Sequence, residues 1–173
     1  IILFRDFLYD YRAQLEVFWG YYPYQKQIIF YLTGDKYFDV EAPMNLRFLG
    51  LWTQYLIYKI VPCIELTKVN ISPPYQNYTC ATFSNAFMNY LSLCGILAVS
   101  FCYSFKKLNL NLVESILTVF LTYIYINHLE AYTLDRISVL YFVITLYFLD
   151  KRLLCIILIL LGSIVNEKII FIL

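Results

Sequence analysis

Charged residues are scarce in this sequence of 173 residues: they make up 14% of it, whereas soluble domains contain about 25%. The formal net charge is only +1, so the chain lacks the basic field that binding to nucleic acid requires. Hydrophobic residues make up 61% of the chain, and a soluble globule of this length needs more polar surface to cover itself. These deficits exclude a soluble enzyme and a disordered chain, and they predict a membrane protein with several spans.

Histidine and glycine are also rare, which removes several classes of enzyme. The single histidine argues against a zinc or haem site. The five glycines form neither of the nucleotide-binding patterns G-x-x-x-x-G-K-[ST] and G-x-G-x-x-G, and neither G-x-S-x-G nor H-E-x-x-H occurs. The sequence therefore lacks the motifs of phosphate-loop ATPases, dinucleotide enzymes, serine hydrolases and zincin proteases.

The five cysteines include no C-x-x-C pair. Cys94, Cys102 and Cys155 lie in apolar runs and are expected to be small buried hydrophobic residues. Cys63 and Cys80 flank one polar loop and would pair if that loop is extracytoplasmic, because disulfides form in oxidising compartments. The cysteine pattern predicts no metal site and leaves one disulfide open.

Long apolar runs are what the sequence has in place of charge. A membrane-spanning helix needs about 20 mostly apolar residues, and four runs approach or reach that length. The start of the chain, 1–8, is interpreted as the end of an upstream span, which makes the sequence part of a longer chain. The predicted fold is all-α, a polytopic transmembrane helix bundle, with spans at 86–105, 112–128, 134–149 and 153–173.

Two short basic loops set the expected orientation of these spans. Lys106-Lys107 follows the first span and Lys151-Arg152 follows the third, so the two loops fall on the same side. Because cytoplasmic loops are enriched in Lys and Arg, we expect both loops in the cytoplasm. The connection His128–Arg136 and the long region 9–85 then face the outside.

The outer region 9–85 is rich in aromatic residues, which favour the membrane interface. Within it, Asn45–Val61 is apolar but carries Arg47, Gln54 and Lys59. A helix that lies in the interface fits this mixture better than a span does, and a span is the alternative. The region is therefore predicted to be an extracytoplasmic loop with an interfacial helix at 45–61.

Charges near the outer ends of the spans are the candidate functional residues, because a charge inside a membrane is costly and commonly functional. Asp135 and Arg136 lie at the outer end of the third span, where an arginine would bind phosphate through its planar guanidinium. Glu167 and Lys168 interrupt the fourth span in its outer third. The alternative is that both clusters are simple charge pairs at helix ends.

The outer region supplies candidate general bases. A general base needs a carboxylate at the mouth of a cavity beside the acceptor, and Asp10, Asp39 and Glu41 are placed for this role, although each is otherwise a solvated loop acid. We expect one polar cavity to open outward, since charges that face lipid would cost roughly a few kcal/mol each. The predicted members of this cavity are Asp10, Arg47, Asp135, Arg136 and Glu167.

Several segments occur in an order that carries a family resemblance. Pro43 and Arg47 fit a Pro-x-x-x-Arg-x-Leu pattern within the run Met44-Asn45-Leu46-Arg47-Phe48-Leu49-Gly50-Leu51-Trp52. Leu134-Asp135-Arg136, Asp150-Lys151-Arg152 and Val165-Asn166-Glu167-Lys168 follow in turn. This layout resembles the N-terminal part of bacterial polytopic glycosyltransferases of the GT-C type.

The resemblance implies the transfer of a sugar from a lipid-phosphate donor to an acceptor at the outer face of the membrane. It also implies a catalytic aspartate in the first outer loop. By position Asp10 is the nearest match and Asp6 is its rival, while the sequence contains no Asp-x-Asp pair. The implied ligand is a lipid-phosphate sugar, and a divalent metal is left open.

Three functions follow from these features. The first is an integral-membrane glycosyltransferase, in the bacterial inner membrane, with membrane lipid and lipid-linked sugar as its partners. The second is a structural or accessory subunit of a membrane complex, encoded by an organelle and located in an organelle membrane. The third is a transporter component. Two observations speak against this function: Ala86–Phe105 contains no charge, and no span has the glycine or proline interruption expected at a midplane site.

Overall fold

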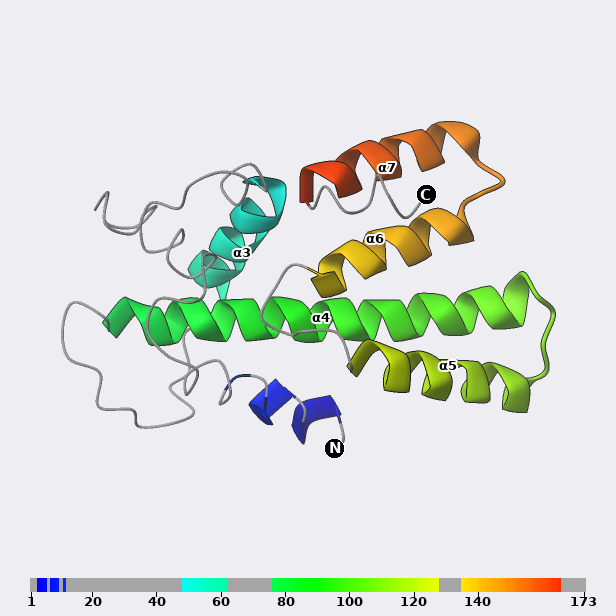
Figure 1. Cartoon of the computed structure of the whole chain (residues 1–173), viewed down its shortest axis with the longest axis horizontal. Helices are drawn as coiled ribbons and strands as arrows, with labels where there is room; N and C mark the ends of the chain where they lie inside the picture. The colour runs from blue at the N-terminus through cyan, green and yellow to red at the C-terminus, as the bar shows by residue number, and fades with distance from the viewer. Residues whose placement is uncertain are drawn as a thin grey trace. The chain divides into compact units, whose positions relative to one another are not determined.

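The computed structural model describes residues 3–5, 7–9, 11, 48–61, 76–127 and 135–165. These residues form helices, with described turns from α4 to α5 and from α6 to α7, and none of them lies in a strand, which confirms the all-α class. The chain divides into two compact units, Ile1–Tyr90 and Leu91–Leu173. The labelled helices are α3 (Phe48–Ile60), α4 (Gln76–Lys106), α5 (Leu112–Asn127), α6 (Asp135–Tyr147) and α7 (Arg152–Val165) (Figure 1).

Helix α4 is the one helix in the described ranges that is long and apolar enough to cross a membrane. Its apolar part, Thr82–Lys106, has 25 residues and a length of about 38 Å at 1.5 Å per residue, more than the roughly 30 Å of a hydrocarbon core. The helix begins at Gln76, ten residues before the predicted start at Ala86, because the intervening sequence contains no proline or glycine to stop it.

Shorter apolar helices occupy the other three predicted runs. Helices α5, α6 and α7 have 16, 13 and 14 described residues, which correspond to about 24, 20 and 21 Å. Their bounds lie within two residues of the predicted ones except at the end of α7, because 166–173 fall outside the described residues. The runs are therefore helical as expected, while a bilayer crossing by each of them stays a prediction.

The first unit contains an aromatic core. Phe7 and Tyr11 pack on Phe83 of α4, with ring centroids 5.8 and 5.9 Å away in edge-on geometry. Phe83 stacks on Phe87 at 6.1 Å, and Phe7 approaches Tyr90 at 5.6 Å. Edge-on and offset ring pairs add to the hydrophobic gain of burial, so the start of the chain is held against α4 by aromatic contacts.

A tight polar turn joins α4 to α5. Asn109 has a left-handed backbone with φ 54°, which asparagine tolerates better than most residues, and the Leu110 N–H donates to Ser104 O at 3.1 Å. Asn111 then caps α5: its Oδ1 accepts from the Glu114 N–H, and Glu114 Oε2 accepts from the Asn111 N–H, both at 2.9 Å. The only charge in the second predicted span is thus bound at the start of its helix.

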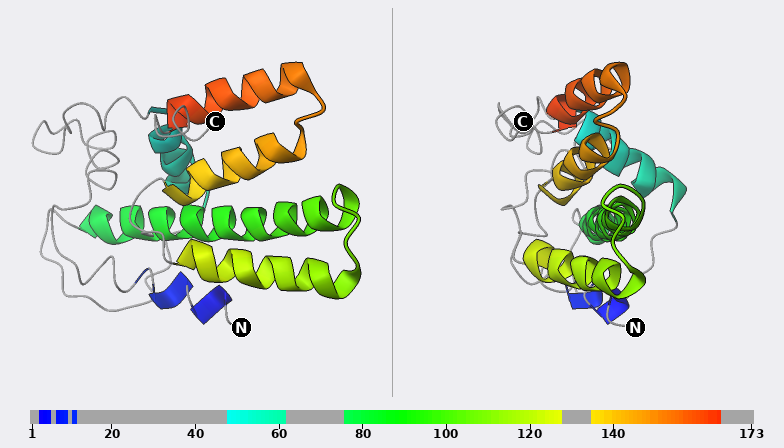
Figure 2. Two further views of the ribbon diagram at one scale, coloured as in Figure 1. Left: turned by 45° about the vertical axis from the view of Figure 1, so that its right-hand side comes forward. Right: turned by 90° about the vertical axis from the view of Figure 1, so that its right-hand side faces the viewer.

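Helices α6 and α7 form a hairpin and run side by side (Figure 2). In the turn the Lys151 N–H donates to Phe148 O at 2.8 Å, and the Cys155 N–H donates to Lys151 O at 3.0 Å as α7 begins. Asp150 of this turn pairs with Lys107 of the α4–α5 turn, with Nζ and Oδ1 3.1 Å apart. The two basic loops therefore lie at the same end of the second unit, as the two predicted spans between them imply.

Helices α4 and α6 approach each other closely at Gly95. A Cβ built on Gly95 would lie 2.9 Å from Leu140 Cδ1 and 3.3 Å from Leu140 Cδ2. Small residues at helix contacts allow this kind of approach, which membrane helices use frequently. Gly95 is therefore a packing residue of the second unit.

Candidate functional site

Most of the predicted site residues lie outside the part of the chain that the structure describes. Arg136 is described in full, and Asp135 is described only as the first residue of α6. The predicted common cavity therefore stays a prediction, because the structure does not bring its members together or separate them. The predicted residues outside the described ranges are Asp6, Asp10, Asp39, Glu41, Arg47, Glu167 and Lys168.

Arg136 is the described charge with the most unusual surroundings. Only 3% of its surface is exposed, and its neighbours Ile137 and Ser138 are buried as well. It lies in the first turn of α6, where unbonded backbone N–H groups and the helix dipole already favour an anion. A guanidinium and a helix start both attract anions, so this position suits an anionic group, either one within the chain or a ligand such as phosphate.

A row of uncharged polar residues on α4 escaped the sequence analysis. Thr82, Asn85 and Asn89 are each fully buried, and their spacing of three and four residues places them on one face of the helix. The Gln54 amide of α3 is fully buried too, and neither of its polar atoms has a hydrogen-bond partner among the residues that the structure describes. The spacing of Thr82, Asn85 and Asn89 was visible in the sequence, but an analysis centred on charge passed over it.

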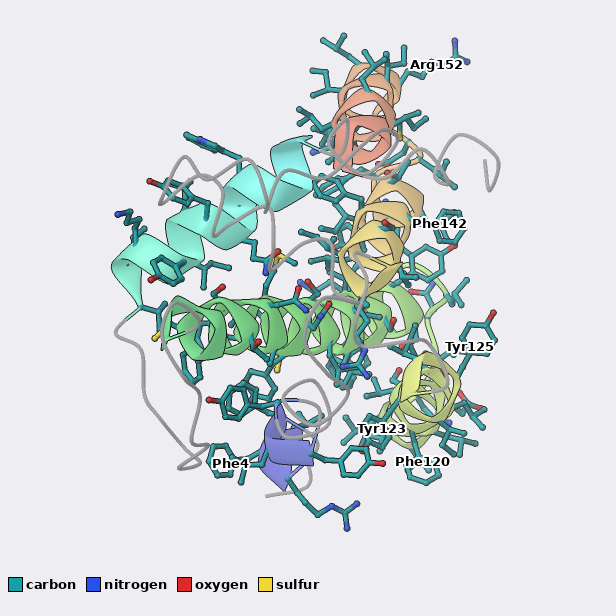
Figure 3. All side chains as sticks on the ribbon, turned by 60° about the vertical axis from the view of Figure 1, so that its left-hand side comes forward. Phe4, Phe120, Tyr123, Tyr125, Phe142 and Arg152 are labelled. Carbon is teal, nitrogen blue, oxygen red and sulfur yellow. The ribbon has the colours of Figure 1, made fainter. Side chains whose placement is uncertain are left out.

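In the second unit several polar side chains are buried alongside apolar ones, and many large apolar side chains are exposed. Val113 of α5 and Leu153 of α7 are 75% and 73% exposed, and Figure 3 shows Phe120 and Tyr125 projecting away from the α5 ribbon. A soluble domain has the opposite distribution. The buried polar residues of this unit are Ser92, Ser100, Ser104, Ser115, Arg136, Ser138 and Thr145.

Several hydroxyl groups of these helices are bonded within their own helix. Thr118 Oγ1 donates to Glu114 O at 2.9 Å, and Thr122 Oγ1 donates to Thr118 O at 2.8 Å. Thr145 Oγ1 donates to Tyr141 O at 2.8 Å in α6. A hydroxyl that is bonded in this way needs no water, so these threonines are compatible with an apolar environment.

The second unit has a cavity of about 360 Å³ between α4, α5 and α6. Its wall is mainly apolar, with the hydroxyl groups of Ser100, Tyr103 and Tyr125 among the polar exceptions. Val139, which lies one helical turn after Arg136, is part of the wall. The cavity wall on α6 therefore begins one helical turn after the buried arginine, which is not itself part of that wall.

The cysteines differ in their redox state. Cys80 is bonded in a disulfide, whereas Cys94, Cys102 and Cys155 are free. Cys63, the remaining cysteine of the sequence, lies outside the described residues. The disulfide lies next to the start of the apolar part of α4, and disulfides are typical of oxidising compartments.

The opposite end of the second unit has the ion pair between Lys107 and Asp150. The ammonium group of Lys107 donates a hydrogen bond to the carboxylate and holds the pKa of Asp150 below its ordinary value. Both side chains are exposed, so this pair positions the two turns more than it stabilises the fold.

Comparisons with protein-family models, with curated proteins and with solved structures found no match to this chain.

Proposed function

We propose that this chain is a multi-pass integral-membrane protein that transfers a sugar from a lipid-phosphate donor to an acceptor at the outer face of the membrane. The observation that carries the membrane part is the distribution of side chains in Leu91–Leu173, with hydroxyl groups and Arg136 inside and large apolar residues outside. Because the hydrocarbon of a membrane contains no water, apolar side chains are favoured on the surface of a bundle that faces lipid, and polar groups are favoured in its interior.

The exposed faces of α5 and α7 suit lipid better than partner helices. Interfaces between membrane helices are enriched in small residues that let backbones approach, as Gly95 does inside this unit. The exposed faces carry large residues instead, which fit the hydrocarbon chains of lipid. They comprise Val113, Ile116, Leu117, Phe120 and Leu121 on α5, and Leu153, Ile156, Ile157 and Leu160 on α7.

Two independent features support one orientation of α4. The disulfide at Cys80 lies just before the apolar part of the helix, and a disulfide favours an oxidising compartment at that end. Lys106 and Lys107 lie at the other end, and the excess of Lys and Arg in cytoplasmic loops favours the cytoplasm for that end. The end of α6 that carries Arg136 lies away from the basic turns and is therefore assigned to the outer side.

Arg136 supports the sugar-transfer part of the proposal. A buried guanidinium at a helix start suits the phosphate of a lipid-linked sugar, and the cavity that reaches Val139 provides room for part of its lipid chain. In the reaction the acceptor oxygen bonds to the anomeric carbon, and the bond from that carbon to the phosphate oxygen breaks. The acceptor proton passes to a carboxylate, for which Asp10 is the candidate by the family resemblance and Asp39 and Glu41 are candidates by their position in the outer region.

A transfer assay on the full-length protein in proteoliposomes tests this function with a panel of polyprenyl-phosphate sugars. Arg136→Gln is expected to lower kcat/KM by about tenfold to a hundredfold, since a charge-assisted hydrogen bond corresponds to roughly that factor. Arg136→Lys keeps the charge but loses the planar guanidinium, so its kcat/KM is expected to lie between those of the wild type and Arg136→Gln. The matched control is Arg152→Gln, which removes an exposed arginine at the other end of the unit.

Two outcomes would overturn the proposal in different parts. Unchanged turnover in Arg136→Gln would remove the assigned role of Arg136. A wild-type protein that transfers no sugar from any donor, although it is inserted and folded, would remove the transferase and leave a structural subunit. Neither outcome affects the membrane topology, which labelling measures separately.

A further inference from the structure

A second cavity of about 260 Å³ lies between α4 and α6, toward the end of the unit that carries the basic turns. It is smaller than the roughly 300–1,000 Å³ of pockets for compact ligands, and its wall is almost wholly apolar. These properties suit a segment of hydrocarbon chain. The residues that line this groove are Ala98, Val99, Cys102, Ile144, Tyr147 and Phe148.

Two lysines stand over the aromatic rings of this groove. Lys107 Nζ lies 5.8 Å from the ring centroid of Tyr147, and Lys151 Nζ lies 5.5 Å from the ring centroid of Phe148. An ammonium group over a ring keeps its N–H donors available for a further acceptor. The apolar groove therefore has two cationic groups at one edge.

The start of α7 adds to the positive potential at this edge. The first helical bond runs from the Cys155 N–H to Lys151 O at 3.0 Å, so the backbone N–H groups of the first turn lie before it. Lys151 stands at the N-cap position, but a lysine side chain contains no hydrogen-bond acceptor and therefore does not bind these backbone N–H groups. Asp150 is the opposing charge, 3.1 Å from Lys107.

We propose that this edge binds an anionic phospholipid of the cytoplasmic leaflet, with one acyl chain in the groove and the phosphate between Lys107 and Lys151. Charge complementarity favours the anionic headgroup, and the apolar groove favours a lipid over a free phosphate. Basic pockets between membrane helices on the cytoplasmic side bind anionic lipids in this way. The inference depends on the membrane part of the proposed function and not on sugar transfer.

The experiment measures lipid binding to the purified full chain by native mass spectrometry, with phosphatidylglycerol and phosphatidylcholine as probes. The test variant combines Lys107→Gln and Lys151→Gln. Its matched control combines Lys106→Gln and Arg152→Gln, which removes the same charge from the same turns. General attraction of anionic lipid to the basic surface contributes about fivefold in affinity per basic residue, and this contribution falls equally in the two variants. If the site exists, the test variant should bind phosphatidylglycerol at least about tenfold more weakly than the control variant.

Filling the groove tests the acyl-chain contact without any change of charge. Ala98→Phe, or Ala98→Leu if the larger residue prevents folding, is expected to abolish preferential binding of long-chain phosphatidylglycerol. Circular dichroism checks that each variant is helical. The proposal would be overturned if both double variants lost phosphatidylglycerol binding equally, or if the variant with the filled groove bound long-chain lipid normally. It would also be overturned if inorganic phosphate displaced the lipid at a similar concentration. A failed sugar-transfer assay would leave this result untouched.

Discussion

Replacing Gly95 by alanine tests the close approach of α4 and α6. Alanine favours a helix over glycine by about 0.5–1 kcal/mol, but its Cβ would lie 2.9 Å from Leu140 Cδ1, and overpacking costs about 1–3 kcal/mol. The nearest atoms belong to the end of a leucine side chain, which can shift. We therefore expect Gly95→Ala to lower the free energy of unfolding by about 0–2.5 kcal/mol.

The decisive measurement repeats the change in a Leu140→Ala background. There the obstructing methyl groups are gone, so Gly95→Ala should raise the free energy of unfolding by about 0.5–1 kcal/mol. The two changes should thus couple by about 0.5–3 kcal/mol, as contacting residues do. The assay is reversible denaturant unfolding in mixed micelles, followed by circular dichroism. An equal effect of Gly95→Ala in both backgrounds would refute the contact.

Three further predictions concern topology, pH and the aromatic core. A membrane-impermeant maleimide added from outside should label a cysteine placed at Tyr132 and spare one at Lys107, and the reverse pattern would refute the proposed orientation. Because the pKa of Asp150 is lowered in the folded chain, its ion pair contributes stability above the ordinary pKa of 3.8 and loses it only as the pH falls below that value through the folded pKa. The difference in stability between wild type and Asp150→Asn should therefore be constant from pH 7 to 5 and shrink below 3.8; a change between pH 7 and 5 would contradict this. Phe83→Ala, which empties a site 5% exposed, should lower the unfolding free energy by about 3–5 kcal/mol, while Phe4→Ala, at a 56% exposed position, should cost much less; equal losses would argue against the core.

The positions of the helices could largely be predicted from the sequence. The apolar runs became helices because their residues favour a helix and hide its backbone polar groups. The early start of α4 at Gln76 could not be predicted from apolarity, since Thr82, Asn85 and Asn89 lower the hydropathy of that stretch. Burial of these side chains depends on neighbours that a one-dimensional window does not contain.

The candidate site was predicted only in part. The expectation that two basic loops share one side needed only the count of spans between them, and the pair between Lys107 and Asp150 bears out their common end. The partners within that pair depend on how the two turns pack, which spacing does not specify. Charge drew attention to Arg136, but its near-complete burial follows from the surroundings of α6 and could not be foreseen.

In the proposed membrane topology, the capped start of α5 affects how deep the second unit lies in the bilayer. Glu114 is held beside Asn111 at the same end as the ion pair of Lys107 and Asp150. If the unit slid toward the outer side by one helical turn, about 5.4 Å, these charges would enter the hydrocarbon together. A charged group costs about 2.5–3.5 kcal/mol at the centre of a membrane, and entry at its edge is already unfavourable, so the charged end acts as a stop against sliding toward the outer side. The apolar faces of α5 and α7 resist sliding toward the cytoplasm, and the depth of the bundle is therefore limited from both directions.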